Sequence, residues 1–195
     1  MAQPPLIDPI QHPDIIVPDA SPLIHLAQSG TLHLLHALGR VVILVDVVRD
    51  EITRDRSKPG AAVLLDWIEA GQRPGSNAPV RVEVTDTGRA IALARVTEPG
   101  FTMRNGGENA IVDWLVDTLQ GTTFSTIVLY ENGRVPRIVA GQAIDANIDV
   151  ITTRAFLDLA ERRGLIASSA AAWALIEAEA STANPQINVF SQRRP

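Results

Sequence analysis

The sequence predicts an α/β protein, a three-layer α/β/α sandwich with a mostly parallel central sheet. Short apolar runs alternate with helix-length segments along most of the 195 residues, which is the pattern of strands joined by helical crossovers. Hydrophobic residues make up 46% of the chain and aromatic residues only 4%. The core is therefore expected to consist of Ala, Val, Leu and Ile, as in helices packed on a buried parallel sheet.

Each expected strand is a short apolar run bounded by turn residues, and each expected helix follows such a run or a breaker. The strands are expected over residues 15–18, 41–45, 80–84, 126–130 and 148–151. The helices are expected on both sides of Gly30-Thr31, from Val47 onward, and over 61–70, 88–96, 107–120, 134–142 and 152–163. The segment 80–84 alternates Val with charged residues, which indicates a half-exposed strand or a sheet edge.

One domain is expected over residues 15–180, because a chain of this length can bury one good α/β core and not two. Residues 1–14 are rich in proline and are expected to form a flexible arm. Residues 181–195 are expected to form a polar tail, and the breaker-rich loop 71–79 is the expected flexible insertion.

Composition excludes several classes of protein. Cysteine is absent, which rules out disulfides and thiolate metal sites and fits the cytoplasm as the expected location. The chain opens without a basic, apolar leader, and no apolar run approaches the roughly 18 residues that span a bilayer. The formal net charge of −5 argues against a broad basic surface that coats nucleic acid. Bound divalent ions would still let a local acidic site accept a phosphodiester.

The most informative residue is Asp19, which stands where the first apolar run gives way to a helix. Ser21 is expected to cap that helix and Pro22 to be its first residue. An acid at a strand end, followed at once by a rigid helix, is held in a fixed direction.

Three further acids stand in similar places: Glu51, Glu108 and Glu131. On its helix Glu108 falls in the arc of the apolar side chains, whereas Asn109, Asp113 and Asp117 share a stripe that should face water. Glu51 lies beside the buried side of a helix that Asp46 is expected to cap, and Asp50 points away from that side. Each acid alone has an ordinary explanation, such as the helix dipole for Glu108 or a surface pair with Arg54 for Glu51.

The stronger argument is that acids far apart in the sequence are expected to converge on one crevice. Residues just beyond the carboxyl ends of parallel strands meet in one crevice, and Asp19 and Glu131 hold such positions. Oxygen ligands of this kind suit Mg²⁺ or Mn²⁺, so a shared divalent-cation site is predicted.

Other candidates are weaker. The spacing of His25, His33 and His36 does not match a zinc helix, so solvated or packing roles are favoured. Trp67 is expected to be a core anchor, and Trp114 and Trp173 also fit core or boundary positions better than base stacking. Arg134 and Arg137 follow the fourth acid closely and are candidates for contact with phosphate.

Taken together, four segments resemble a PIN-domain protein, the fold of many prokaryotic toxin ribonucleases. They are Asp-Ala-Ser-Pro-Leu-Ile at 19–24, Val-Val-x-x-Glu-Ile at 47–52, Gly-Gly-Glu-Asn-Ala at 106–110, and Ile-Thr-Thr-Arg-Ala-Phe-Leu-Asp-Leu-Ala-Glu-Arg-Arg-Gly-Leu-Ile at 151–166. The similarity extends over residues 15–166. The last segment is similar to the end of a PIN subgroup related to the toxins.

The resemblance implies a Mg²⁺- or Mn²⁺-dependent endoribonuclease with RNA as its substrate and the four acids as metal ligands and catalytic groups. It implies a supporting role for Ser21, and it leaves an antitoxin protein and a second copy of the chain open as partners. Where the family usually has aspartate at the fourth acidic position, this chain has Tyr130-Glu131-Asn132. Either Glu131 supplies the missing oxygen with a longer reach, or Asn132 is the aligned residue and a charge has been lost.

Two functions therefore stay open. One is the ribonuclease, as the toxin of a toxin–antitoxin pair. The other is a PIN-like RNA- or protein-binding regulatory module with weak or no activity, which Asn132 favours. A phosphatase with Asp19 as nucleophile is disfavoured, because that chemistry wants a second acid two residues later and Ser21 is there.

Overall fold

A computed structural model of the protein describes residues 13–56, 60–131 and 147–183. The strands are β1 (Ile15–Pro18), β2 (Val41–Val45), β3 (Val80–Glu83), β4 (Ser125–Tyr130) and β5 (Asn147–Thr152). The helices are α1 (Ala20–Gln28), α2 (Leu34–Leu38), α3 (Asp46–Thr53), α4 (Ala61–Gln72), α5 (Asp86–Thr97), α6 (Gly106–Leu119), α8 (Thr153–Arg162) and α9 (Ser169–Ala183). The predicted α/β/α class is confirmed.

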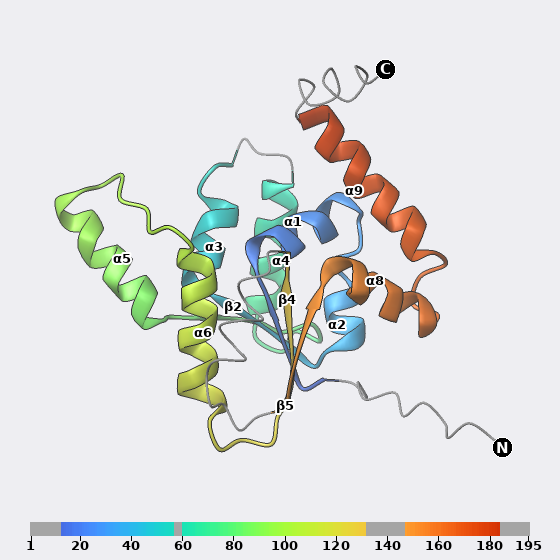
Figure 1. Cartoon of the computed structure of the whole chain (residues 1–195), viewed down its shortest axis with the longest axis horizontal. Coiled ribbons are helices and arrows are strands. Elements are labelled where there is room, and N and C mark those ends of the chain that lie inside the picture. Colours follow the sequence, from blue (N-terminus) through green and yellow to red (C-terminus); the bar gives the residue numbers. More distant parts are fainter. Residues whose placement is uncertain (1–12, 57–59, 132–146, 184–195) are drawn as a thin grey trace, which may run out of the picture.

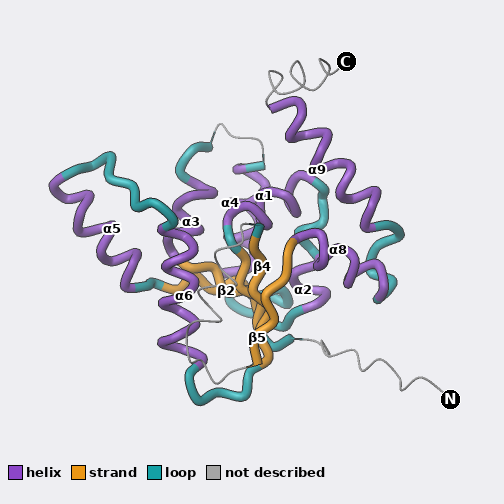
Figure 2. The backbone as a smooth tube through the Cα atoms, in the orientation of Figure 1, coloured by secondary structure: helices purple, strands orange, loops and turns teal. Residues whose placement is uncertain are grey.

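The sheet lies at the centre of the molecule, with helices on both of its faces (Figure 2). Its five strands are all parallel and follow the order β3-β2-β1-β4-β5. A parallel sheet must be covered on both faces, so its inner strands carry apolar residues at successive positions. Ile16 on β1, Leu44 on β2 and Val128 on β4 are all 0% exposed. The expected strand at 80–84 is the edge strand β3, as its alternation of Val with charged residues indicated.

The order of the strands determines where a site can form. From β1 the chain moves outward through β2 to β3, and then crosses to the other side of β1 for β4 and β5. Ligands of doubly wound sheets bind beyond the carboxyl ends of the strands at the point where this order reverses. Here that point lies between β1 and β4, which pair in the register Ile15 to Thr126 through Pro18 to Leu129.

The start of α1 differs from the prediction. The helix begins at Ala20, and Asp19 holds the cap position with an extended backbone (φ −77°, ψ 171°). The carbonyl oxygen of Asp19 accepts a hydrogen bond from the Leu23 amide at 3.3 Å. Ser21 is therefore an exposed residue of the first turn rather than the cap. The helix starts as soon as the strand ends, because Pro22 at its third position needs no amide partner.

Other boundaries also differ by one to three residues, and α4 runs to Gln72, two residues into the expected loop 71–79. Asp46 is the first residue of α3 rather than its cap. Helix α5 begins at Asp86, two residues earlier than expected, because the Thr85 hydroxyl caps it by accepting from the Gly88 amide at 3.0 Å. Helix α9 extends to Ala183, so the first three residues of the expected polar tail are helical.

Other predictions fall outside the described residues, namely residues 1–12 of the arm expected over 1–14, the helix at 134–142 and the tail from 184 onward. Asp14, the last residue of that expected arm, is held in place by a hydrogen bond from its amide to the Ser125 carbonyl oxygen at 2.9 Å. Among the helices that the structure describes, none has the length and apolar character that a membrane span requires.

Candidate functional site

Asp19 lies at the carboxyl end of β1, next to the point where the strand order reverses. Its amide donates to the carbonyl oxygen of Leu129 on β4 at 2.9 Å, which fixes the backbone between the two central strands. The residue is 7% exposed. Burial raises the pKa of its carboxyl to about 6, against a smaller opposing effect from the Ala20 amide, and the charges of Glu108 and Glu131 raise it further.

Glu108 reaches the same region from the first turn of α6, where it is 8% exposed. The turn before it is tight: Asn105 has a left-handed backbone (φ 57°) and precedes two glycines. Asparagine tolerates this conformation better than most residues. The turn brings the backbone of Gly107 against the other acids.

The absent side chain of Gly107 marks the centre of the site. A Cβ on Gly107 would lie 3.2 Å from Oδ1 of Asp19 and 3.3 Å from Oε2 of Glu51. Two carboxylate oxygens from α3 and the end of β1 therefore lie around one point beside the start of α6. Only glycine leaves that point free.

Glu51 comes from α3 and is an exposed residue, and its Oε2 atom lies beside Gly107. Burial raises the pKa of that carboxyl, and the charges of Asp19 and Glu108 raise it further. The Gly107 amide and the charge of Arg54 act in the opposite direction and lower this pKa. Arg54, which the sequence offered as an alternative partner for Glu51, donates instead to Asp50 Oδ2 at 2.5 Å.

Glu131 follows β4 and completes the set. Its Oε1 atom accepts a hydrogen bond from the Thr153 amide at the start of α8 at 3.2 Å, and lies 3.5 Å from Nδ1 of His25. Its charge contributes to the raised pKa of Asp19. Glu131 thus ties α1, β4 and α8 together at the edge where the other acids lie. We call Asp19, Glu51, Glu108 and Glu131 the acidic site.

The acidic site suits a hydrated ion better than a closed cage. In the described part of the chain, no three His, Asp or Glu side chains are placed so that they could hold one metal ion together. Mg²⁺ is usually bound through one or two carboxylates and keeps several waters. The oxygen-only donors and their mutual repulsion fit such an ion, and the oxygens of Asp19 and Glu51 that lie beside Gly107 are the pair that could hold it.

The other predicted residues are placed as follows. Ser21 is exposed on the first turn of α1, two residues after Asp19. Asn132, Arg134 and Arg137 lie outside the described residues. His33 is exposed, and the ring centroid of His36 lies 5.7 Å from that of the half-buried Trp67.

Two contacts that hold neighbouring helices together were not predicted from the sequence. Asp113 was expected to face water, but its Oδ2 accepts from the amide of Thr87 at 2.9 Å and from its hydroxyl at 2.5 Å, which fastens α5 to α6. Asp50 Oδ2 also accepts from Arg95 at 2.8 Å, which fastens α5 to α3. The Thr-Asp-Thr-Gly run at 85–88 signals a capped helix, but nothing in it identifies the acid that binds Thr87.

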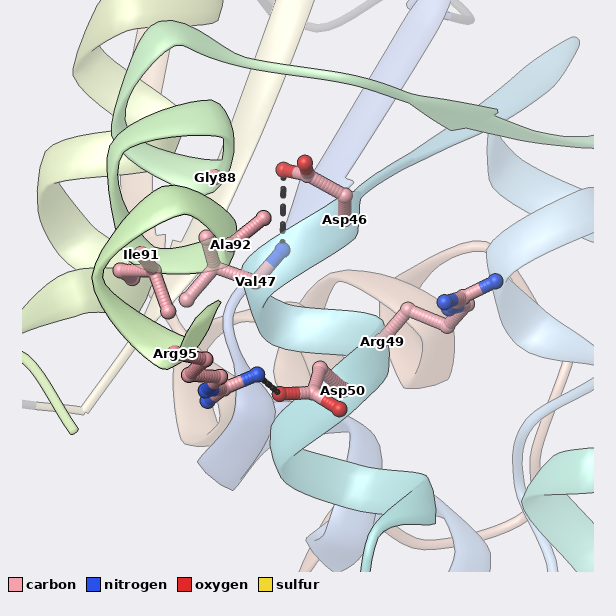
Figure 3. A pocket seen from close by; sticks show the side chains of 8 residues that line it. All are labelled: Asp46, Val47, Arg49, Asp50, Gly88, Ile91, Ala92 and Arg95. Carbon is pink, nitrogen blue, oxygen red and sulfur yellow. Dashed lines mark hydrogen bonds and ion pairs between the residues drawn. The ribbon is translucent and has the colours of Figure 1, made fainter. Parts of the chain in front are cut away.

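A separate hollow among the described residues is lined by none of the four acids of the acidic site. That hollow, of about 170 Å³, lies between α3 and α5 and is lined by Asp46, Asp50 and Arg95 among others (Figure 3). Its acids already have partners: Asp46 accepts from the Val47 amide and the Thr85 hydroxyl, and Asp50 is paired with two arginines. The polar contacts in this hollow therefore stabilise the fold, whereas the carboxylates of the acidic site repel one another.

Comparisons of the chain with protein-family models, with curated proteins and with solved structures found no match.

Proposed function

We propose that the protein is a metal-dependent endoribonuclease of PIN type, with Mg²⁺ or Mn²⁺ held at the acidic site. The observation that supports this most strongly is the position of Gly107, where oxygens of Asp19 and Glu51 lie 3.2 and 3.3 Å from the space that a side chain would fill. Buried carboxylates that repel one another are costly without a cation. Their location beyond β1 and β4 is where doubly wound sheets bind ligands.

The chain's own residues prepare the site in three ways. Asp19 and Glu108 are buried, so their carboxylates are held in fixed directions with little competing water. The Thr153 amide donates to Glu131 and orients it, and the Gly107 amide opposes the rise in the pKa of Glu51. When bound, a divalent ion supplies a water of lowered pKa and stabilises the charge that develops on a phosphodiester. The carboxylates would hold that ion and position the water in line with the scissile bond.

The resemblance leaves open whether residue 131 or residue 132 supplies the fourth acidic group, and we assign that group to Glu131. We include its neighbours Asn132, Arg134 and Arg137 in the proposal as substrate contacts, and Ser21 as a support for Asp19. The proposed partners are RNA, an antitoxin protein and a second copy of the chain, and the proposed location is the cytoplasm.

The test is cleavage of single-stranded RNA by purified protein with Mn²⁺. EDTA should stop cleavage, and Asp19→Ala or Glu108→Ala should abolish it, since each removes a ligand. Asp117→Ala is the matched control, because Asp117 is an exposed acid of α6. Activity that survives EDTA, or that both ligand variants retain, would refute the proposal.

A second candidate is a PIN-like module that binds RNA or protein without turnover. It is favoured by one observation, that no three acids of the described residues are placed for one ion. A correctly folded protein that binds RNA but leaves a broad RNA panel uncut with Mn²⁺ would support this candidate instead.

A further inference from the structure

Beside the acidic site, side chains from α1 and α8 both lie against Trp173 of α9. The ring centroids of His25 and Trp173 are 5.9 Å apart and their planes meet at 79°. The guanidinium carbon of Arg154 lies 5.5 Å from the centroid of the Trp173 ring. We call His25, Arg154 and Trp173 the aromatic–basic patch. In Figure 1 the three helices lie side by side.

The patch adjoins the acidic site directly. Glu131 Oε1 lies 3.5 Å from Nδ1 of His25 and accepts from the amide of Thr153, the residue before Arg154. Because α8 begins at the carboxyl end of β5, Arg154 stands at the same edge of the sheet as the acids. A substrate that reaches the acidic site can therefore reach the patch without leaving that edge.

The patch is open to solvent. The Arg154 side chain is 47% exposed and that of His25 is 27% exposed, and Trp173 is partly buried. Arg154 also lies 3.9 Å from Asp158, a distance at which an exposed ion pair contributes little and yields to a better anion. The indole N–H of Trp173 is already used, since it donates to Glu177 at 2.9 Å.

We propose that the aromatic–basic patch is a subsite for single-stranded RNA, with a phosphate on Arg154 and a base against Trp173 and His25; this rests on the proposed nuclease function. Proteins that hold single strands combine a cation for the backbone with aromatic rings for the bases. The pairing matters here because the chain has a net charge of −5 and the acids repel phosphate. A local cation beside an aromatic pair offsets that repulsion where the strand would enter.

The test measures binding of a labelled single-stranded RNA of about 12 nucleotides in EDTA, over roughly 50 to 200 mM salt. Arg154→Ala should weaken binding about tenfold and reduce the slope of log K against log salt by about 0.7, the value for one phosphate on a single strand. Trp173→Leu should weaken binding about tenfold with the slope unchanged, since stacking releases no counterion, and Trp173→Phe should restore most of the affinity. Arg162→Ala, the same charge change at the other end of α8, should leave both quantities as in the wild type.

Melting temperatures check that each variant is folded. If Trp173→Leu does not fold, Arg154→Ala decides the matter, because Arg154 is exposed. An unchanged affinity and salt slope in Arg154→Ala would overturn the proposal, as would equal losses in Arg162→Ala.

The proposed function is tested separately, by cleavage with Mn²⁺. Cleavage that continues normally in Arg154→Ala and Trp173→Leu, with wild-type binding in both, would refute the subsite and leave the nuclease standing. Binding that depends on Arg154 and Trp173 without any cleavage would refute the nuclease and leave the subsite. Absence of both binding and cleavage would refute both.

Discussion

Gly107 lies directly against Asp19: a Cβ on the glycine would be 3.2 Å from Oδ1 of the acid. The same atom would lie 3.3 Å from Oε2 of Glu51 and 3.3 Å from a methyl group of Val48. These separations are shorter than ordinary van der Waals contact, so a Cβ there would push its neighbours, the two carboxylates among them, outward by a few tenths of an ångström. A substitution at Gly107 therefore tests whether the carboxylates of Asp19 and Glu51 bind a ligand.

Gly107→Ala should therefore impair metal binding more than folding. We expect the rise in melting temperature caused by Mn²⁺ to fall by half or more, while the melting temperature in EDTA changes by only a few degrees. Gly106→Ala is the matched control, because its Cβ would meet methyl groups of Ile91 and Val47 at 3.3 Å and no carboxylate. Thermal denaturation of both variants with and without Mn²⁺ measures the difference. A full response to Mn²⁺ in Gly107→Ala would contradict the site.

The wild-type protein should itself be stabilised by the metal. A ligand at one hundred times its Kd stabilises a protein by about 2.7 kcal/mol, and about 1 kcal/mol shifts the melting temperature of a chain of this size by roughly 2–4 °C. We expect a rise of roughly 5–10 °C with saturating Mn²⁺, and a smaller one for Asp19→Asn. A melting curve that does not move over millimolar Mn²⁺ would count against any metal at these acids.

The raised pKa of Asp19 predicts a pH dependence in the metal-free protein. The folded carboxyl titrates near pH 6 and the unfolded one near 3.8. Between these values the folded state binds more protons, so the free energy of unfolding should fall as pH rises from about 4 to 6 and stay lower above it. The raised pKa of Glu51 acts in the same direction.

Asp19→Asn should remove that effect. In EDTA we expect the variant to be more stable than the wild type above pH 6, by at most about 3 kcal/mol, and equal to it below about pH 4. Asp117→Asn, which removes an exposed carboxylate, should change little. Urea denaturation across pH 4–8 tests this, and equal stability of wild type and Asp19→Asn at every pH would show that Asp19 is not buried among like charges.

The fold class followed from the sequence because strand and helix periodicities are local and the turn residues between them are strong. Asp19 could be singled out for the same reason, since a carboxylate between an apolar run and a helix is visible in one short segment. The close approach of Asp19 and Glu51 to Gly107 could not be predicted, because it depends on how α3 and α6 pack. The pairing of His25 with Glu131 joins residues more than one hundred positions apart, and no local pattern signals it.

The helix boundaries predicted from the sequence were wrong for a different reason. Ser21 has the chemistry of a cap, but the strand ends at Pro18 and the backbone of Asp19 is already extended, so the helix begins two residues earlier than expected. Asp113 was expected to face water because that prediction used only its angular position on the helix. Its partner Thr87 lies on a helix whose position depends on the rest of the fold.

Asp113→Ala should destabilise the protein by loosening α5. The carboxylate accepts both the amide and the hydroxyl of Thr87 in the first turn of that helix, an arrangement comparable to a helix cap, whose loss costs about 0.5–2 kcal/mol. Asp117→Ala, one turn further along α6 and exposed, is the control and should cost much less. Equal unfolding free energies for the two variants would show that the contact with Thr87 contributes nothing.

The fourth acidic position is tested by Glu131→Gln. Glutamine can still accept the hydrogen bond from the Thr153 amide, so the fold should be retained and the melting temperature in EDTA should not fall. It removes one negative charge beside Asp19, so Mn²⁺-dependent cleavage of RNA should drop at least about tenfold if Glu131 acts on the metal, as the loss of about 1.4 kcal/mol would imply. Wild-type cleavage by Glu131→Gln would mean that Glu131 only anchors α8.

Asn132→Asp then decides between the two interpretations of Tyr130-Glu131-Asn132. If Glu131 already fills the position, an added carboxylate at residue 132 should change cleavage little, because the ligand set is complete. An inactive wild type that Asn132→Asp converts into an Mn²⁺-dependent ribonuclease would instead identify the natural chain as a disarmed nuclease. Combining Asn132→Asp with Glu131→Gln separates the positions further, since activity regained in the double variant would show that either position can supply the fourth carboxylate.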